Sequence, residues 1–216
     1  MDLDAFLEHL SSGKPVQGGS EAHLFMHGVS QEALKITAEI NGSYHTPEEL
    51  RALFSKLIGQ PVDDTFGLFP PFYTDCGKNI HLGKHVFINM GCKFQDQGGI
   101  FIGDGALIGH NVVLATLNHA MSPKDRATMV PASIHIGRNV WIGANATVLP
   151  GVTIGDNSVI GAGSVVTKDI PAGVVAIGNP CQVLRKINEK DREFYFKNRR
   201  IDLSDPDLSV ALDDIT

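Results

Sequence analysis

The fold is decided by residues 134–171, which read IHIGRNVWIGANATVLPGVTIGDNSVIGAGSVVTKDIP. A large aliphatic side chain occupies every sixth position of this stretch: Ile136, Ile142, Val148, Ile154, Ile160 and Val166. A second series of residues precedes the first by two positions: Ile134, Val140, Ala146, Val152, Ser158 and Ser164. Residues two apart on a strand share a face, so both series point inward.

A short strand that turns a corner every six residues builds a solenoid, whose stacked coils bury a continuous core. Small residues such as Gly137 and Gly143 follow the large aliphatic ones, and glycine suits a tight corner. The strands of a β-sandwich recur every 8–12 residues or so, and rarely so strictly, which argues against that fold. Three strands of six residues give coils of 18 residues, so the sequence predicts a mainly β protein with a triangular parallel β-helix.

The six-residue spacing starts near residue 80 and is interrupted near 95–99 and over 115–133. Its earlier members are Leu82, Ile88, Phe94, Ile102, Ile108 and Leu114. From Leu114 to Ile136 the register advances by 22 residues, which we interpret as four more than one coil. Loops that leave a rigid scaffold often carry functional groups, and His119 lies where the chain departs.

Residues 1–60 have a different pattern, which predicts a small helical cap. Thr46 and Glu49 form a capping box, Pro47 takes the first helical position and Gly59 ends the apolar periodicity, so we expect a helix over 46–58. Shorter helical patterns cover 2–10 and 31–40. We therefore divide the chain into a cap (1–60), a β-helix (61–187) with an excursion loop (115–133), and a C-terminal segment (188–216). In that last segment, residues 188–200 are expected to form a short helix containing Phe194 and Phe196, followed by an acidic tail.

Composition excludes several classes of protein. The 216 residues include 18 basic and 24 acidic side chains, a formal net charge of −6, so no basic surplus exists to neutralise nucleic acid. No apolar stretch is long enough to span a membrane, and the acidic start predicts no secretory signal. Three widely spaced cysteines without a CxxC pair indicate reduced thiols in a cytoplasmic protein.

Alternation also predicts which side chains face outward. Trp141 and Val159 lie 18 residues apart and should stack on one side of the prism. Thr147 with Val165, and His135 with Thr153, mark the other two sides. No helices follow the strands to cover these faces, so an exposed apolar side implies a partner in a closed cyclic arrangement.

The stretch 71–187 resembles the maltose/galactoside O-acetyltransferase group of hexapeptide-repeat acyltransferases. The resemblance is carried by residues 71–81, Asn89, Asn118, His119, and residues 136–144, 150–171 and 178–181. It implies a left-handed coil, and a homotrimer whose active sites lie between subunits. It also implies transfer of an acetyl group from acetyl-coenzyme A to the hydroxyl of a sugar or similar small molecule.

Within this resemblance, His119 is the matched general base, since histidine titrates near neutral pH. The N–H of Ala144 is the matched donor to the developing oxyanion. Asn89 would hold the acceptor hydroxyl, although an asparagine at a corner can equally be there for a left-handed backbone. Asp75 and Asp96 are further candidates for acceptor binding. No covalent enzyme intermediate is required, and Cys76 and Cys92 are expected to be structural.

The resemblance also implies a coenzyme A path along the groove between neighbouring β-helices. Its matched residues are Trp141 against the pantetheine arm, then Ala144, Ala162, Thr167, Lys168, and Arg185 at a phosphate with Lys186 beside it. Two departures stand out. Gln182 replaces a common cation, and residues 15–21 lack the acidic and aromatic segment that usually frames the sugar.

Three other readings remain open. An amine or an antibiotic hydroxyl would serve as an acceptor for the same chemistry. A trimeric zinc enzyme of the carbonic-anhydrase type needs histidines five apart plus a third from an earlier coil, but His81 and His85 are four apart, and His110 and His119 nine apart. We therefore expect no metal. A scaffold without catalysis would not need His119, Asn89 and Trp141.

Overall fold

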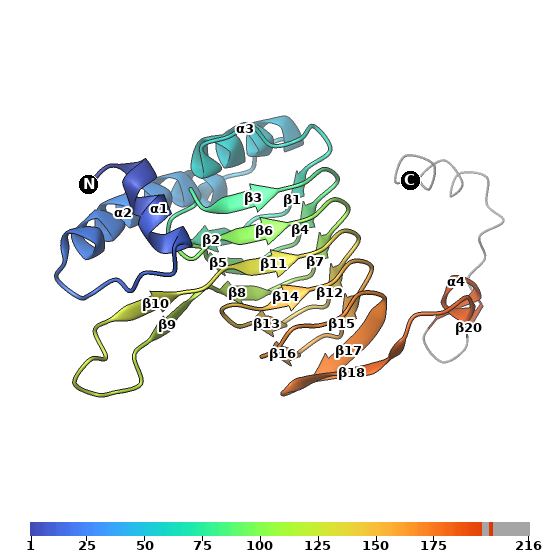
Figure 1. Cartoon of the computed structure of the whole chain (residues 1–216). Coiled ribbons are helices and arrows are strands. Elements are labelled where there is room, and N and C mark those ends of the chain that lie inside the picture. The colour runs from blue at the N-terminus through green and yellow to red at the C-terminus, as the bar shows by residue number, and fades with distance from the viewer. Residues whose placement is uncertain (196–198, 201–216) are drawn as a thin grey trace.

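The computed structural model describes residues 1–195 and 199–200. Its centre is a triangular solenoid with three parallel sheets, which confirms the predicted β-helix (Figure 1). Sheet 1 contains β1 (Gly67–Leu68), β4 (Phe87–Ile88), β7 (Leu107–Ile108), β12 (Trp141–Ile142), β15 (Val159–Ile160) and β17 (Val174–Gly178), and ends with the antiparallel β18 (Cys181–Lys186). Sheet 2 contains β2 (Phe72–Thr74), β5 (Cys92–Gln95), β8 (Val113–Ala115), β13 (Thr147–Val148) and β16 (Val165–Val166). Sheet 3 contains β3 (Ile80–Leu82), β6 (Ile100–Ile102), β11 (Ile134–Ile136) and β14 (Thr153–Ile154).

The chain visits the sheets in the order 1, 2, 3, so each coil has three corners. Every member of the two inward series of residues 134–166 is buried. The outward pairs also stack as predicted: Trp141 lies beside Val159, Thr147 beside Val165, and His135 beside Thr153. The alternation of the sequence therefore fixed both faces of each strand.

Coil length varies more than the sequence analysis assumed. Phe72 pairs with Cys92 and Ile80 with Ile100, each 20 residues on, because the corner at 75–79 adds two residues to the first span and the corner at 96–99 adds two to the second. Ile102 pairs with Ile136, 34 residues on rather than 18, so the excursion adds 16 residues. The expected excess of four residues was wrong, because Leu114 and Ile136 lie on adjacent sheets and not on the same one.

Three helices cover the first coil, as Figure 1 shows: α1 (Leu3–Ser11), α2 (Glu21–Gly42) and α3 (Pro47–Ile58). Helix α3 begins with the predicted capping box and ends at Gly59 in a left-handed conformation. Helix α2 is far longer than the expected 31–40, because Ser20 caps a new start ahead of its weakly periodic first half. Phe54 of α3 packs on Phe66 and Phe72, which joins the cap to the core of the solenoid.

The C-terminal prediction was wrong in part. Helix α4 covers only Lys190–Glu193, and the chain continues into an antiparallel pair, β19 (Phe194–Tyr195) and β20 (Arg199–Arg200). Aromatic residues favour strands, which explains why the helix stops before Phe194. Phe196 and the acidic tail 201–216 lie outside the described residues. In the part that is described, no helix is long and apolar enough to cross a membrane.

Candidate active site

His119 lies on a hairpin that leaves the solenoid between sheets 2 and 3. The hairpin consists of β9 (Leu117–His119) and β10 (Met129–Pro131), and Figure 1 shows it extending away from the coils. The Nδ1 atom of His119 lies 2.8 Å from the carbonyl oxygen of Arg126. A carbonyl only accepts hydrogen bonds, so Nδ1 carries the proton and Nε2 keeps its lone pair. His119 is exposed, so this lone pair is available to a ligand.

The N-terminal segment holds this hairpin in place. The backbones of Val16 and Met129 exchange two hydrogen bonds of 2.8 Å each. Their side chains belong to a second apolar cluster that also contains Phe6 and Leu10 of α1. Gly18 lies so close to the hairpin loop that a Cβ there would be 2.9 Å from the Cβ of Ala127. The position of His119 thus depends on the cap as well as on the solenoid.

Asn89 and Ala144 lie on the corner between sheets 1 and 2. The side-chain oxygen of Asn89 accepts a bond of 2.9 Å from the N–H of Met90, and Asn89 does not have a left-handed backbone. This excludes the purely conformational explanation for Asn89. Its NH₂ group and the N–H of Ala144 have no hydrogen-bond acceptor among residues 1–195 and 199–200. Two free donors therefore lie along one corner, two coils apart.

Glycine at position 109 brings the coils close beneath this corner. A Cβ at Gly109 would lie 2.8 Å from the nitrogen of Ala144 and 2.7 Å from the carbonyl oxygen of Ile142. Such distances are shorter than van der Waals contact, so a side chain at position 109 would displace the coil that carries the Ala144 N–H. Ala162 is exposed one coil further along the same corner, where the N–H of Gly163 donates to the carbonyl of Ala144.

The corner between sheets 2 and 3 carries the acidic candidates. Asp96 is fully buried, and it accepts bonds from the hydroxyl of Thr74 (2.6 Å) and from the backbone N–H groups of Cys76 (2.9 Å) and Asn79 (3.2 Å). Burial raises the pKa of Asp96, while these donors oppose the shift. Asp96 therefore does not reach the surface where an acceptor would bind, and we assign it to holding the wide corner. Asp75 is exposed at the same corner.

Gln97 is a residue behind Asp75 that the sequence analysis missed. Its side-chain nitrogen lies 3.3 Å from Oδ2 of Asp75, while its oxygen is buried without a hydrogen-bond partner within the described structure. Buried polar atoms are rarely left unpaired, so this oxygen marks a place for a buried water molecule, and the role of Gln97 at this corner is to hold Asp75. The interruption of the repeat at 95–99 was the signal in the sequence that pointed to this corner.

The expected cofactor residues lie on sheet 1 and at the two corners that border sheet 2. Trp141 is 53% exposed on sheet 1, beside Leu107, which is 49% exposed, and Arg185 lies on β18 of that sheet. Thr167 and Lys168 are exposed and follow β16, where the chain leaves sheet 2. Arg185 forms a bidentate ion pair with Asp191 at 2.6 and 2.7 Å, which lowers the pKa of Asp191.

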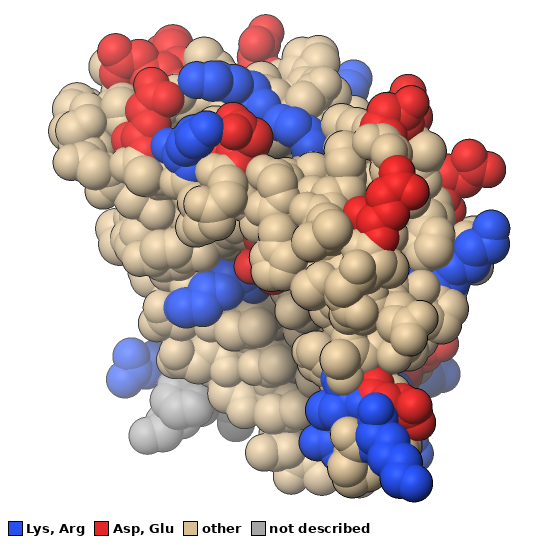
Figure 2. Space-filling model, turned by 90° about the vertical axis from the view of Figure 1, so that its left-hand side faces the viewer, with Lys and Arg blue, Asp and Glu red and all other residues tan. Residues whose placement is uncertain are grey.

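One copy of the chain therefore carries two half-sites on different corners. The first half contains Asn89, Ala144 and Ala162, and the second contains His119, Asp75 and Gln97. Both corners border sheet 2, so this sheet separates the two halves within one solenoid. Figure 2 shows the side of the molecule that carries the hairpin, where few charges lie between the helical cap and the last coils.

The remaining ligand chemistry is limited. All three cysteines are free and buried, and burial raises the pKa of Cys92 to about 11 and that of Cys76 further. Their thiols are protonated near neutral pH and are poor nucleophiles. Among the described residues, no group of three or more His, Cys, Asp or Glu side chains is arranged to hold a metal ion.

A triangular solenoid with a histidine-bearing hairpin defines the class of hexapeptide-repeat transferases. The family model "Bacterial transferase hexapeptide (six repeats)" matches residues 133–168. The galactoside O-acetyltransferase of Lactococcus lactis subsp. lactis (strain IL1403) is 42% identical over 179 residues, which cover 81% of this chain and 86% of the relative. The chain belongs to the galactoside/maltose O-acetyltransferase group of the hexapeptide-repeat family.

Solved structures agree with this assignment. A galactoside acetyltransferase in complex with coenzyme A is similar with a TM-score of 0.79 and 35% identity, over 94% of this chain and 99% of the other. A maltose O-acetyltransferase from Clostridium difficile 630 has a TM-score of 0.78 and 37% identity, over 85% of this chain and 97% of the other. These relatives confirm the left-handed β-helix and the predicted enzyme class, an acetyl-coenzyme A-dependent O-acetyltransferase.

Proposed function

We propose that the protein transfers the acetyl group of acetyl-coenzyme A to a hydroxyl of a sugar or sugar-like acceptor, in a site formed by two copies of the chain. The observation that carries this proposal is the division of one set of matched residues between two corners that flank sheet 2. A heterologous contact through sheet 2 would pair the first half-site of one copy with the second half-site of the next. Repeating that contact around a threefold axis closes a trimer with three complete sites.

The chemistry follows from the free donors and the free lone pair. Nε2 of His119 removes the proton of the acceptor hydroxyl, while the Nδ1–H bond to Arg126 holds the ring. The NH₂ group of Asn89 binds the acceptor oxygen. Attack on the thioester carbon forms a C–O bond and places negative charge on the carbonyl oxygen, which the N–H of Ala144 stabilises. The C–S bond then breaks, and the thiolate receives the proton from the imidazolium.

Direct transfer needs no acyl-enzyme, which agrees with the burial of the three cysteines. Trp141 and Leu107 provide apolar surface for the pantetheine arm, and Ala162 leaves room beside it. Thr167 and Lys168 would reach the cofactor from the neighbouring copy. Arg185 would meet a phosphate while sharing its guanidinium with Asp191. We place the enzyme in the cytoplasm, where free thiols persist.

The base is tested with His119→Ala. We expect loss of acetyl transfer, measured as free thiol released from acetyl-coenzyme A, with an unchanged oligomer mass and melting temperature. His27→Ala is the matched control, because His27 is an exposed histidine on α2. A rate for His119→Ala close to that of the wild type would remove the base assignment. Amines and hydroxylated antibiotics in the acceptor panel test the alternative acceptors.

The shared site is tested by complementation. His119→Ala and Asn89→Ala are each expected to be inactive, but random mixed trimers of the two should regain about a quarter of wild-type activity, because one site in four takes both intact residues from different copies. A site contained within one chain would give no recovery, since every chain carries one defect. This outcome separates a trimeric site from a monomeric one without changing the assay.

A further inference from the structure

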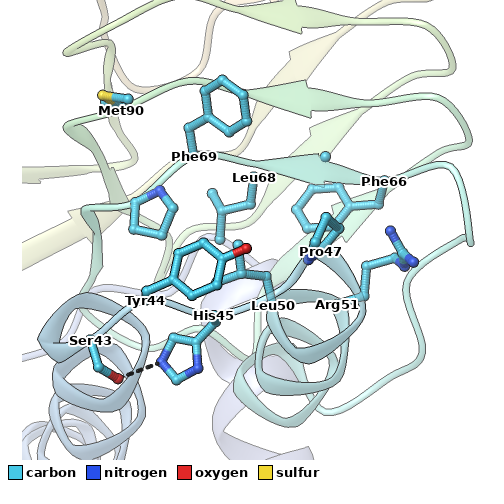
Figure 3. Close-up of a pocket in the computed structure, with 12 residues that line it drawn as sticks. Ser43, Tyr44, His45, Pro47, Leu50, Arg51, Phe66, Leu68, Phe69 and Met90 are labelled. Atoms are coloured by element: carbon cyan, nitrogen blue, oxygen red, sulfur yellow. Dashed lines mark hydrogen bonds between the residues drawn. The ribbon is translucent and has the colours of Figure 1, made fainter.

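The helical cap approaches the solenoid on both sides of sheet 2. On the side of Asn89, a cavity of about 610 Å³ lies between the α2–α3 junction and the first coils, as Figure 3 shows with Tyr44, Phe69 and Met90. The N–H of Met90 donates to the side chain of Asn89, so this cavity adjoins the first half-site. The hairpin that carries His119 lies on the other side of sheet 2, and its position depends on contacts of its own.

The hairpin has little structure of its own to hold it. Strands β9 and β10 pair only with each other and form a two-stranded sheet apart from the three sheets of the solenoid. Asn118, His119 and Val130 are exposed on it. An isolated two-stranded hairpin is marginally stable in water. Besides the contacts with the cap, the place where the hairpin joins the solenoid must therefore set its direction.

Thr116 lies at this junction, directly before β9, and is fully buried. Its hydroxyl donates to the carbonyl oxygen of Gln95 and accepts a bond of 2.8 Å from the N–H of Gly98. Its backbone carbonyl accepts a bond of 2.9 Å from the N–H of Ala132, which directly follows β10. Thr116 thus joins the outgoing and the returning strand of the hairpin to the corner at 95–99 of the preceding coil.

Two residues of that corner complete the junction. The side-chain oxygen of Gln95 accepts a bond of 3.2 Å from the N–H of Leu117, the first residue of β9. A Cβ at Gly98 would lie 2.7 Å from the carbonyl oxygen of Thr116 and 2.9 Å from the nitrogen of Ala132. Both distances are shorter than van der Waals contact, so glycine is what allows the corner to approach the hairpin this closely.

The same corner also holds the acceptor candidate Asp75. The side-chain nitrogen of Gln97 lies 3.3 Å from Oδ2 of Asp75, and Gln97 directly precedes Gly98. The hairpin of His119 and the carboxylate of Asp75 are therefore attached to one short segment of chain. Direct transfer needs reacting atoms about 3–3.5 Å apart, so a fixed separation between a base and an acceptor ligand favours it.

We propose that Thr116 and Gln95 are positioning residues, whose side chains fix the direction of the hairpin and thereby place Nε2 of His119 against the acceptor hydroxyl. The proposal rests on the proposed function, because it needs His119 as the base. Thr116 is buried and acts only through the hairpin. A displacement of about 1 Å can cost around a hundredfold in rate, so loss of these contacts lowers kcat. The KM for acetyl-coenzyme A stays, because the expected pantetheine surface of Trp141 and Leu107 lies on sheet 1.

The experiment removes the hydroxyl and keeps the shape. Thr116→Val leaves the buried N–H of Gly98 without its acceptor, and we expect kcat to fall about 10- to 100-fold with KM for acetyl-coenzyme A changed less than about twofold. Thr116→Ser keeps the hydroxyl and should recover kcat to within about threefold of the wild type. Gln95→Met, which removes the acceptor for Leu117, should lower kcat about tenfold and carries the test if Thr116→Val does not fold.

Thr37→Val is the matched control. Thr37 is a buried threonine on α2 whose hydroxyl donates to the carbonyl oxygen of Ala33 at 3.0 Å, so its loss also removes a buried hydrogen bond. We expect Thr37→Val and Thr116→Val to lose similar melting temperature, but only Thr116→Val to lose kcat. Mixed trimers locate the defect: Thr116→Val with Asn89→Ala should regain about a quarter of wild-type activity, whereas Thr116→Val with His119→Ala should not exceed the residual activity of Thr116→Val.

The outcomes separate this proposal from the proposed function. Wild-type kcat in Thr116→Val, or a loss in Thr116→Ser as large as in Thr116→Val, would overturn the positioning role and leave the transferase function intact. So would a raised KM with unchanged kcat, or a regain of activity in the mixture with His119→Ala. A wild-type rate in His119→Ala alone would instead reject the base of the proposed function, and this proposal with it.

Discussion

The substitution Gly18→Ala, which adds one methyl group, should displace the proposed general base His119 without contacting the reacting atoms. A Cβ at position 18 would lie 2.9 Å from the Cβ of Ala127 and 3.2 Å from its carbonyl oxygen. Carbon atoms pack at about 3.5–4.0 Å, so Gly18→Ala must push the hairpin loop away by roughly 0.6–1 Å. Ala127 directly follows Arg126, whose carbonyl accepts the 2.8 Å bond from His119.

The expected consequence is kinetic. A displacement of about 1 Å in a positioning contact can cost around a hundredfold in rate, so we expect kcat to fall about 10- to 100-fold with Gly18→Ala. Thiol release from acetyl-coenzyme A measures the rate, and the melting temperature reports on the fold. Gly28→Ala is the matched control, because nothing lies within 4 Å of a Cβ at that helical position. It should keep full activity and gain about 0.5–1 kcal/mol of stability.

A double mutant completes the test. Ala127→Gly removes the nearer clashing atom, so Gly18→Ala with Ala127→Gly should recover most of the lost rate. Wild-type kcat in Gly18→Ala alone would refute the reasoning, since the loop would then move without disturbing His119. A loss that Ala127→Gly does not repair would also refute it, because the damage would come from somewhere other than this contact.

Two further predictions concern stability and pH. Asp96→Asn replaces a buried acceptor of several hydrogen bonds by a group that is partly a donor. It should lower the free energy of unfolding by about 2–4 kcal/mol in denaturant titrations. A loss below about 0.5 kcal/mol would mean that Asp96 does not hold the wide corner. Burial lowers the pKa of His81 in the folded protein. As the pH falls, His81 therefore takes up a proton in the unfolded chain before it does in the folded one. The free energy of unfolding decreases as the pH drops from the unfolded pKa of His81 toward its lower folded pKa. His81→Phe, which can keep the 4.6 Å stack on Phe101, should therefore lose less melting temperature than the wild type between pH 8 and pH 5, and an identical loss would exclude His81 as a cause.

Much of the solenoid could be predicted from the sequence, because its strands and corners follow from residues that are close together in the chain. Each strand alternates inward and outward residues, and Ile136, Ile142 and Val148 repeat at the spacing of the corners, so burial follows from position alone. The helix over 46–58 was equally local, since its capping box and its terminal glycine lie within it. The length of α2 and the strands after α4 were missed, because weak periodicity and strand pairing left no short-range signal.

The candidate site was only partly predictable. The resemblance to the family identified His119, Asn89 and Ala144. Nothing in the sequence shows that Asp96 is buried with all its hydrogen bonds inside its own corner, while Gln97 keeps an unpaired oxygen. Both residues are buried, and only the packed structure decides which hydrogen-bond partners each of them meets. The same holds for Arg185, whose partner Asp191 is six residues away on a different element.

The amino-acid sequence by itself determined the coil, its three faces and the place where a loop carrying the histidine leaves it, because these depend on spacing and on the chemistry of single residues. Only the tertiary structure decided that the two halves of the site lie on separate corners flanking sheet 2, that Val16 and Gly18 brace the hairpin, and that a 610 Å³ cavity adjoins Asn89. These features depend on which coils stack and how the cap folds back, and such contacts join residues that are distant in the chain.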